Sequence, residues 1–422
     1  MLRQFRWFIP LVVTALVLAA CGTSTTGNAK QVTVIGTWTG AEQDAFLAMV
    51  KPWETETGNS VKYQGTRSIN DILAAGVPTG VLPDLAGLPG PGQMAEYAKA
   101  GALQPLDDVI DVATYTSETS PALTKLGKVG DKTYGVFVKA ALKGLIFYNP
   151  KLHDYSASPP ATWDDLTSQG TANQGNAKAI WCLGLASGDA SGWPATDWIE
   201  NILLRQAGPD VYNDWTAGKV KWTDPKIKAA FDLYMQVVNS SFGGGTNAVA
   251  TKFELAGDPL FSSPPGCELF QQASFMSGQG AFKPLKPGTD YNAFPFPAIN
   301  SQYAKAVEGA GDLFGMFHAT DAAKSLMKYL VTAKAQDIWV KIGGALSANK
   351  NATDYPDAFS KAQGAAVANA EQFVFDASDQ MPSAMNAAFW THLVSLTSGS
   401  ETVDAALTAL QKVADDAYKP AP

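Results

Sequence analysis

The chain has 422 residues, of which 46% are hydrophobic and 17% are charged, and this composition is typical of a folded protein with two or three domains. A formal net charge of −8 without clustered Lys and Arg excludes the electrostatic footprint of a nucleic-acid-binding protein. The three histidines are far apart in the sequence, and neither a zinc motif nor a phosphate-binding loop occurs. We therefore expect no nucleic-acid partner, no metal and no cofactor.

The first 21 residues have the pattern of a secretory signal. Arg3 and Arg6 precede an uncharged apolar run that is shorter than the roughly 20 residues of a membrane-spanning helix. The segment that ends in Cys21 (Leu-Ala-Ala-Cys) resembles a lipobox, in which the cysteine is acylated and the chain is cut before it. We expect a lipoprotein signal peptide over 1–20 and a flexible tether over 21–30. The alternative is an ordinary signal peptide followed by a chance cysteine.

Strands and helices are predicted to alternate at the start of the mature chain. Alternating and β-branched residues predict the strands, and apolar residues at helical spacing predict the helices. This order favours a mainly parallel sheet, in which ligands bind beyond the carboxyl ends of the strands. It therefore places the loops 38–42 and 88–93 at a common site. The expected strands are 31–37, 60–64 and 82–86, and the expected helices are 42–57, 70–75 and 94–100.

The rest of the chain continues as a mixture of strands and amphipathic helices. Loops are expected over 187–197 and 343–350, and 291–297 is expected to be irregular. Further strands are expected at 134–138, 142–148, 179–185 and 313–317. Further helices are expected at 198–206, 226–239, 321–331, 334–340, 358–370, 382–396 and 401–417.

Two cysteines remain once Cys21 is assigned to the lipid. Cys182 and Cys267 form an even pair in an oxidising compartment, which predicts a disulfide. In the loop-entropy model, closing this loop raises the free energy of the unfolded chain by about 4 kcal/mol and so stabilises the folded protein. Two buried free thiols are the alternative.

Several motifs, in this order, resemble one family over nearly the whole mature chain. They are Trp38-Thr39-Gly40 after the first strand, Pro83-Asp84-Leu85, Ala98 to Leu103, Phe147 to Pro150, Thr162-Trp163-Asp164, Gly309 to Asp312, Gly343 to Ser347, Met381-Pro382 and Phe389-Trp390. With them the chain resembles the extracellular solute-binding proteins of the maltose-binding type, the receptors of sugar ABC importers. The segments 181–184, 192–197 and 264–267 are similar to those of α-glucoside receptors.

The resemblance implies an α/β, periplasmic-binding-protein-like fold of class II. Two discontinuous lobes with mainly parallel sheets are joined by a hinge and close around the ligand. Residues 31–141 and 312–346 are expected to form the first lobe, and 145–309 and 349–422 the second. The crossings between them are expected near Leu142, Gly309 and Leu346.

The candidate ligand-binding residues follow from their places in this scheme. Glu42 is a candidate acceptor for sugar hydroxyls, although an exposed first-turn glutamate is an equal alternative. Trp193, Phe275 and Trp390 are candidate stacking platforms, whereas Trp181 and Trp198 are expected in the core. Arg67 and Lys143 are candidates for which a solvated charge is the alternative. The remaining candidates are Trp38, Thr39, Pro89, Gly90, Gln93, Asp197, Gln272, Asp312, Gly343 and Gly344.

Together these features predict a monomeric, lipid-anchored receptor outside the cytoplasm, in the periplasm or on the outer cell surface. It would bind a neutral sugar such as an α-glucoside and deliver it to ABC permease subunits. A glycoside hydrolase with paired carboxylates is one alternative, although no acid and nucleophile motif is recognisable. A receptor for a different small solute is another.

Overall fold

The first strands of the chain belong to a mixed sheet. The computed structural model describes residues 31–173 and 177–419, and the expected signal peptide, Cys21 and the tether lie outside the described residues. The strands of this first sheet are ordered β12-β11-β3-β1-β2, and β6 also pairs with β11. Their bounds are β1 Gln31–Gly36, β2 Ser60–Gly65, β3 Leu85–Leu88, β6 Gly135–Leu142, β11 Ala306–Met316 and β12 Gln372–Phe375.

The parallel part of the first sheet matches the predicted alternation. Strand β1 pairs in parallel with β2, with Gln31 opposite Ser60, and with β3, with Val34 opposite Leu85. The carboxyl ends of these three strands therefore meet at the same edge. Strand β11 is parallel to β12 but antiparallel to β3 and β6.

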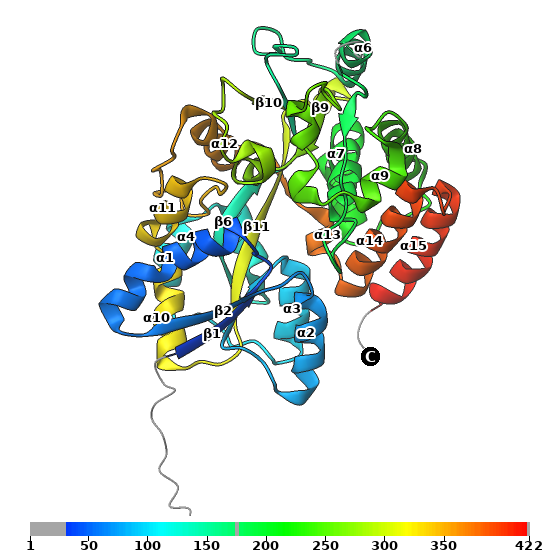
Figure 1. The fold of residues 1–422 in the computed structure, drawn as a ribbon. Coiled ribbons are helices and arrows are strands. Elements are labelled where there is room, and N and C mark those ends of the chain that lie inside the picture. The colour runs from blue at the N-terminus through cyan, green and yellow to red at the C-terminus, as the bar shows by residue number, and fades with distance from the viewer. Residues whose placement is uncertain (1–30, 174–176, 420–422) are drawn as a thin grey trace, which may run out of the picture.

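Helices cover both faces of this sheet because side chains alternate along each strand. Val32 and Val34 pack toward α1, α10 and α11, whereas Ile35 packs on the opposite side toward α2 and α3. Figure 1 shows these helices around the sheet. Their bounds are α1 Ala41–Thr57, α2 Ile69–Gly76, α3 Pro91–Lys99, α10 Asp321–Leu330 and α11 Ala333–Ile342, and the short helices α4 Val112–Glu118 and α5 Pro121–Leu126 lie between α3 and β6 in the chain.

A second sheet has the strand order β10-β7-β9-β8. Strand β7 is antiparallel to both neighbours, and only the β8–β9 pair of this sheet is parallel. The prediction of a mainly parallel sheet is therefore wrong here. A strand can pair in parallel with β7 only if the chain first crosses back to the end at which β7 begins. Strands β9 and β10 instead begin at the end at which β7 finishes. The bounds are β7 Leu145–Tyr148, β8 Trp181–Cys182, β9 Leu269–Gln272 and β10 Asn292–Pro295, and a separate hairpin consists of β4 Lys128–Val129 and β5 Lys132–Thr133.

Helices pack against the second sheet around an aromatic core. Trp198, Trp215 and Trp222 are buried there, and Trp181 is buried beside them, so the prediction that Trp181 and Trp198 belong to the core is confirmed. The helices are α6 Trp163–Asn173, α7 Trp193–Thr216, α8 Pro225–Asn239, α9 Gly244–Ala250, α12 Ala358–Ala368, α13 Ala377–Gln380, α14 Ser383–Ser398 and α15 Val403–Ala417. Short 3-10 helices are η1 Val77–Thr79, η3 Phe253–Leu255, η4 Asp258–Phe261, η5 Ser274–Gly278, η6 Gly280–Phe282 and η7 Ser301–Tyr303.

Several predicted segments differ from the structure. The expected strand 142–148 is broken at Gly144, whose positive φ of 66° ends β6 and lets β7 start in the other sheet. The expected loop 187–197 ends at Gly192, because Pro194 fits the first turn of α7. Helix α7 kinks at Gly208 and continues, rather than ending there. The segment expected to be irregular near residue 294 contains β10, which pairs with β7.

The two sheets are connected by long neighbouring strands. In Figure 1, β6 and β11 run side by side from one part of the molecule into the other. A third segment lies next to β6, where Leu346 exchanges backbone hydrogen bonds of 2.8 and 3.1 Å with Ala140. Polar residues at this connection are therefore held close to both sheets.

A disulfide joins Cys182 and Cys267, as predicted, and the free-thiol alternative is wrong. Cys182 is in β8, and Cys267 lies just before β9, the strand that pairs with β8, with Glu268 between them. The disulfide thus closes a long loop that contains α7, α8 and α9.

A search of the described helices for a stretch with the length and hydropathy of a membrane span finds none.

Candidate functional site

A cavity lies where the carboxyl ends of β1, β2 and β3 face the start of α7. Together with the space that is open to solvent, it measures about 900 Å³. The first sheet supplies Trp38 and Pro89 from the ends of its strands, as the rule for parallel sheets predicts. The other side supplies Trp193 and Asp197 from the first turns of α7.

Lys139 is the centre of a charge network on the first side of the cavity. This buried lysine of β6 forms an ion pair with Glu42 and lies 3.7 Å from an Asp312 carboxylate oxygen. Arg67 approaches the other Glu42 oxygen at 3.6 Å. Burial raises the pKa of Glu42, but Lys139 and Arg67 outweigh burial, so its pKa is lowered overall. Burial likewise raises the pKa of Asp312, and there Lys139 does not compensate fully.

Lys143 is the centre of a second network on the other side. Its Nζ donates to Asp197 at 2.7 Å and to Asp376 at 2.9 Å, and all three side chains are buried. Burial raises the pKa of Asp197 to about 7, although Lys143 opposes this rise. Burial acts to raise the pKa of Asp376 as well, but the Lys143 ammonium acts in the opposite direction. The pKa of Asp376 is lowered overall. The site therefore holds fixed donors and acceptors away from bulk water.

Aromatic rings line the cavity between these two networks. Trp193 meets the Phe253 ring edge-on with centroids 4.9 Å apart, and Phe275 lies 6.0 Å from Trp193. The Lys143 ammonium lies 5.2 Å from the Trp193 ring centroid. Trp390 adds an indole whose N–H is buried and has no hydrogen-bond partner among the described residues. These rings offer apolar faces beside charged groups.

The structure brings most of the predicted site residues together. Twelve of the predicted residues lie on the wall of one of two cavities. The cavity between the sheets is lined by Trp38, Glu42, Arg67, Pro89, Lys143, Trp193, Asp197, Phe275, Asp312 and Trp390. An adjoining cavity beside the start of α1 is lined by Glu42, Phe275, Gly343 and Gly344.

The other predicted site residues do not line either cavity. Gln93 is buried and its amide donates to Asn70, which does line the main cavity. Gln272 is buried in β9, where its side-chain oxygen accepts from the next backbone N–H. Gly90 faces the backbone of Asp379, and a Cβ there would lie 2.2 Å from the Asp379 carbonyl oxygen. Thr39 is half-buried outside the cavity lining.

Sequence reasoning missed several residues that line the cavity, and the strongest omission is Lys139. It is the single charged residue in the buried strand β6, Gly135–Leu142. A lysine that interrupts an apolar strand is a usable signal, because burying an ammonium requires partners. Asp376 and Asp379 gave a weaker signal, because acidic residues before a helix are also ordinary caps. Indeed Asp376 caps α13 through the Asp379 N–H.

Side chains meet across the mouth of the cavity. Ser68 donates to Asp189, and the Arg67 guanidinium lies 5.0 Å from the Phe253 ring centroid. Farther along, Ser383 of α14 donates its backbone N–H to Glu96 of α3 at 2.9 Å. These contacts join the part around the first sheet to the part around the second.

Comparisons with known proteins agree with this architecture. A model of the family described as bacterial extracellular solute-binding protein matches residues 48–369. The osmoprotective compounds-binding protein GgtB of Synechocystis sp. is 33% identical over 93% of this chain and 95% of its own length. The alpha-glucosides-binding periplasmic protein AglE of Rhizobium meliloti is 31% identical over 92% of this chain and 87% of its own.

Solved structures show the same fold. A chitin oligosaccharide binding protein superimposes with a TM-score of 0.79 at 21% sequence identity, covering 93% of this chain and all of that chain. The α/β fold of solute-binding proteins that the sequence motifs implied is thus confirmed. From the extent of the family match and of the two relatives, the chain belongs to the bacterial extracellular solute-binding proteins.

Proposed function

We propose that this protein captures a small neutral sugar, an α-glucoside or another di- or oligosaccharide, and delivers it to the permease of an ABC importer. The observation that carries the proposal is the cavity wall, where Trp193, Phe275 and Trp390 stand beside the two lysine-centred carboxylate networks. A sugar ring has an apolar C–H face that packs on an aromatic ring and hydroxyl groups at its edge. Carboxylates and lysines at that edge accept and donate charge-assisted hydrogen bonds.

The relatives support this class of solute. The names of two similar proteins refer to osmoprotective compounds and to α-glucosides. Lys139 and Lys143 each contact carboxylates, so charged donors and acceptors lie side by side at the cavity wall. Neighbouring charged donors and acceptors suit the hydroxyl groups of a neutral polar solute, because each hydroxyl can both donate and accept a hydrogen bond.

We propose the lobe boundaries that the sequence implied, 31–141 with 312–346 and 145–309 with 349–422, with crossings near Leu142, Gly309 and Leu346. The hydrophobic clusters support this division. Clusters on both faces of the first sheet draw mainly on residues 32–138 and 313–348, whereas the large cluster beside the second sheet draws on 146–306 and 374–414. Hinge closure at the crossings would trap the solute between the lobes.

Membrane attachment through Cys21 is part of the same proposal. An acylated cysteine with the tether 21–30 would hold the receptor outside the cytoplasm and near its permease. We propose that the mature protein acts there as a monomer. Metabolic labelling with a radioactive fatty acid would test the anchor: label on the wild type but not on Cys21→Ser is expected, and unlabelled wild-type protein would contradict it.

Intrinsic fluorescence tests the proposed solute class, because Trp193 and Trp390 line the cavity. The protein is titrated with maltose, trehalose, sucrose, raffinose and glycosylated glycerol, and with an amino acid as a control solute. We expect a saturable change with micromolar or tighter affinity for at least one α-glucoside. Silence across the glucosides would contradict the proposal.

We also propose that the protein binds sugar without converting it, in line with a family and relatives that are binding proteins. The same sugars are incubated with the protein and analysed by chromatography. Full recovery of each sugar is expected, and hydrolysis that depends on the protein would favour the glycoside hydrolase alternative instead.

A further inference from the structure

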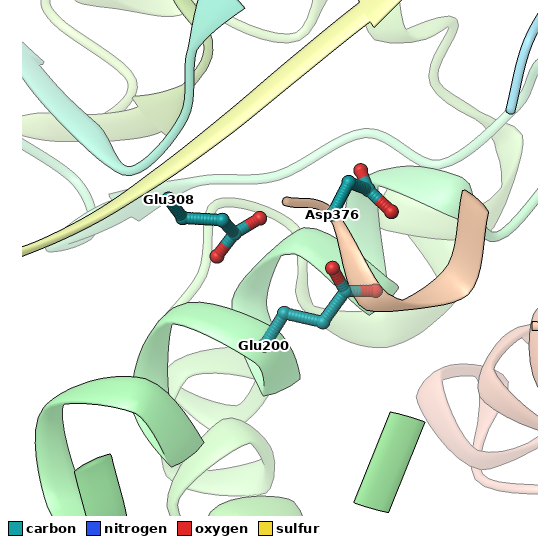
Figure 2. Close-up of side chains that lie close together, drawn as sticks. All are labelled: Glu200, Glu308 and Asp376. Carbon is teal, nitrogen blue, oxygen red and sulfur yellow. The ribbon is translucent and has the colours of Figure 1, made fainter. Parts of the chain in front are cut away.

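A cluster of buried carboxylates lies beneath the cavity, behind the Lys143 network. Glu200 of α7, Glu308 of β11 and Asp376 at the start of α13 bring carboxylate oxygens within 4.8 Å of one another, and all three residues are buried. Figure 2 shows the Glu308 carboxylate pointing toward the other two. The three residues come from segments that are far apart in the sequence, so the fold assembles this cluster.

Two of the carboxylates are already held in place by hydrogen bonds. Glu200 accepts the backbone N–H of Ala377 at 2.8 Å and of Ser378 at 3.2 Å, and also the Tyr212 hydroxyl at 3.2 Å. Asp376 accepts from Lys143 and caps α13. These bonds fix the two groups while leaving some of the roughly four lone-pair positions on each carboxylate free.

Glu308 has no comparable partners. Its side chain is 1% exposed, and neither carboxylate oxygen accepts a hydrogen bond from any group in residues 31–173 or 177–419. Burying a carboxylate without a partner is unfavourable, so native proteins normally pair it or place a cation beside it. An unpartnered acceptor aimed at two other fixed carboxylates is therefore an independent indication of a ligand.

The nearby protein cations do not satisfy Glu308. Lys143 uses its ammonium for Asp197 and Asp376, and only its backbone N–H reaches the Glu308 carbonyl oxygen, at 3.0 Å. Arg205 directs Nη1 to the carbonyl oxygens of Tyr303 and Ala304. The three carboxylates of the cluster therefore keep an excess of negative charge after these contacts of Lys143 and Arg205 are counted.

We propose that Glu200, Glu308 and Asp376 bind a Ca²⁺ ion that ties the crossing strand β11 to α7 and α13. Oxygen-only ligands select hard cations rather than zinc or copper. Ca²⁺ takes six to eight oxygen ligands in a flexible geometry, whereas Mg²⁺ dehydrates reluctantly and is usually held by only one or two carboxylates. Three buried carboxylates with oxygens within 4.8 Å of one another can share one cation, and their number favours Ca²⁺.

The site would connect the cation to the solute cavity through Asp376. This residue lines the cavity, contacts Lys143 and belongs to the carboxylate cluster. A cation that holds Asp376 would also hold Lys143, which contacts Asp197 on the cavity wall. The inference concerns the cation alone, and its test does not require that a sugar bind.

Terbium luminescence and calorimetry test the proposal on purified protein that has been treated with a chelator. Tb³⁺ replaces Ca²⁺ in oxygen sites, and Tyr212 lies close enough to sensitise it, since its hydroxyl contacts Glu200. We expect Tyr- and Trp-sensitised Tb³⁺ emission that Ca²⁺ displaces, one Ca²⁺ per chain by calorimetry, and a melting temperature that rises with Ca²⁺. The affinity expected is about 10⁻⁶–10⁻³ M.

Two variants distinguish a defined Ca²⁺ site from nonspecific attraction of the cation to acidic groups. Glu308→Gln should fold, because it removes a buried unpaired charge, and should abolish both the emission and the Ca²⁺-dependent rise in melting temperature. Asp379→Asn removes a neighbouring negative charge outside the cluster and should change Ca²⁺ affinity by less than tenfold. Absence of Ca²⁺ binding to the wild type, or unchanged binding by Glu308→Gln, would overturn the proposal and leave protons as the neutralising species.

Discussion

Individual side chains in the cavity have roles that their burial and partners distinguish. Trp193 is half-buried beside Phe253 and Phe275 on the cavity wall, whereas Trp181 is 2% exposed in the core beside Trp198. Trp181 belongs to the apolar strand β8, whereas Trp193 starts a helix after a Gly-containing loop and lines the cavity. The same substitution at the two positions should therefore affect different properties.

Trp193→Ala should weaken sugar binding by about tenfold or more, which corresponds to ~1.4 kcal/mol, because it removes a stacking face. Trp181→Ala should instead lower the free energy of unfolding by about 3–5 kcal/mol through the core cavity that it leaves. Fluorescence titration and urea unfolding of both variants measure the two effects. If Trp193→Ala bound sugar as the wild type does, its place in the site would be wrong.

Lys139→Met should destabilise the protein by about 3–5 kcal/mol, because it removes the cation that the buried Glu42 shares with the half-buried Asp312. The double variant Lys139→Met with Glu42→Gln should recover part of this loss, since it also removes one of the stranded charges. Urea unfolding of the two variants checks the expectation. A loss in the single variant below about 1 kcal/mol would show that the network is solvated.

Asp197 should make stability fall as pH rises. Its native pKa is raised to about 7 by burial, facing Lys143 and Asp376, so the folded state binds more protons than the unfolded state between about pH 4 and pH 7. Burial raises the pKa of Glu200 and Glu308 in the same direction. Stability conferred by a protonated Asp197 is thus present at low pH and is lost as pH approaches 7.

Melting temperatures measured from about pH 5 to about pH 8 in chelator test this dependence. Asp197→Asn should have a shallower decline than the wild type, by up to about 1.4 kcal/mol per pH unit. The exposed Asp232→Asn is a matched control and should follow the wild-type curve. Parallel curves for Asp197→Asn and the wild type would contradict the assignment of the raised pKa to this carboxyl.

At the scale of elements, the disulfide constrains the part of the chain that carries α7. With the loop between Cys182 and Cys267 closed, the loop-entropy model gives about 4 kcal/mol of stabilisation. The double variant Cys182→Ser with Cys267→Ser should lose stability of this order in urea unfolding. Thiol titration of the denatured, unreduced wild type should detect neither cysteine, and two titrating thiols at these positions would contradict the structure.

The local sequence pattern was sufficient to predict those strands and helices whose own residues determine their formation. The β-branched alternation of β1 and the apolar spacing of α1 were readable because each element buries one face. The segment of β10 was not readable, since the strand ends in Pro295, is followed by Pro297, and exists only through its pairing with β7. Likewise the break between β6 and β7 depends on the fold, because Gly144 separates strands of different sheets.

The candidate site could be predicted where it follows strand ends. Glu42 and Arg67 follow β1 and β2 and do line the cavity, as the rule for parallel sheets implies. Lys139 and Asp376 come from the middle of β6 and from the segment after β12, which only tertiary pairing brings to the same place. The buried Glu308 was equally hidden, because nothing in its local sequence distinguishes it from an exposed residue of a strand.

At the scale of the whole molecule, the contacts across the cavity mouth hold the two parts together. Asp189 accepts from Ser68, and Glu96 accepts from Ser383. Neither acidic residue lines the cavity, so both can be changed without removing a direct contact to a bound solute. Both contacts therefore act between the two parts and not on the solute.

The double variant Asp189→Ala with Glu96→Ala should therefore weaken sugar binding by about two- to tenfold, because a ligand that prefers the closed state binds less tightly when that state is less populated. Stopped-flow fluorescence should show the loss as faster dissociation. Glu371→Ala, which removes an exposed carboxylate, is the control and should leave both rates unchanged. Unchanged dissociation in the double variant would show that these contacts do not secure closure.

The central claim is that a sugar binds in the cavity between the two sheets, and a crystal structure of the protein with its tightest-binding α-glucoside tests it most directly. The account predicts one sugar ring against Trp193 or Trp390, with hydroxyls within hydrogen-bond distance of Glu42, Lys143 or Asp197. A cavity that holds only water at saturating sugar, or a sugar bound elsewhere on the molecule, would contradict it.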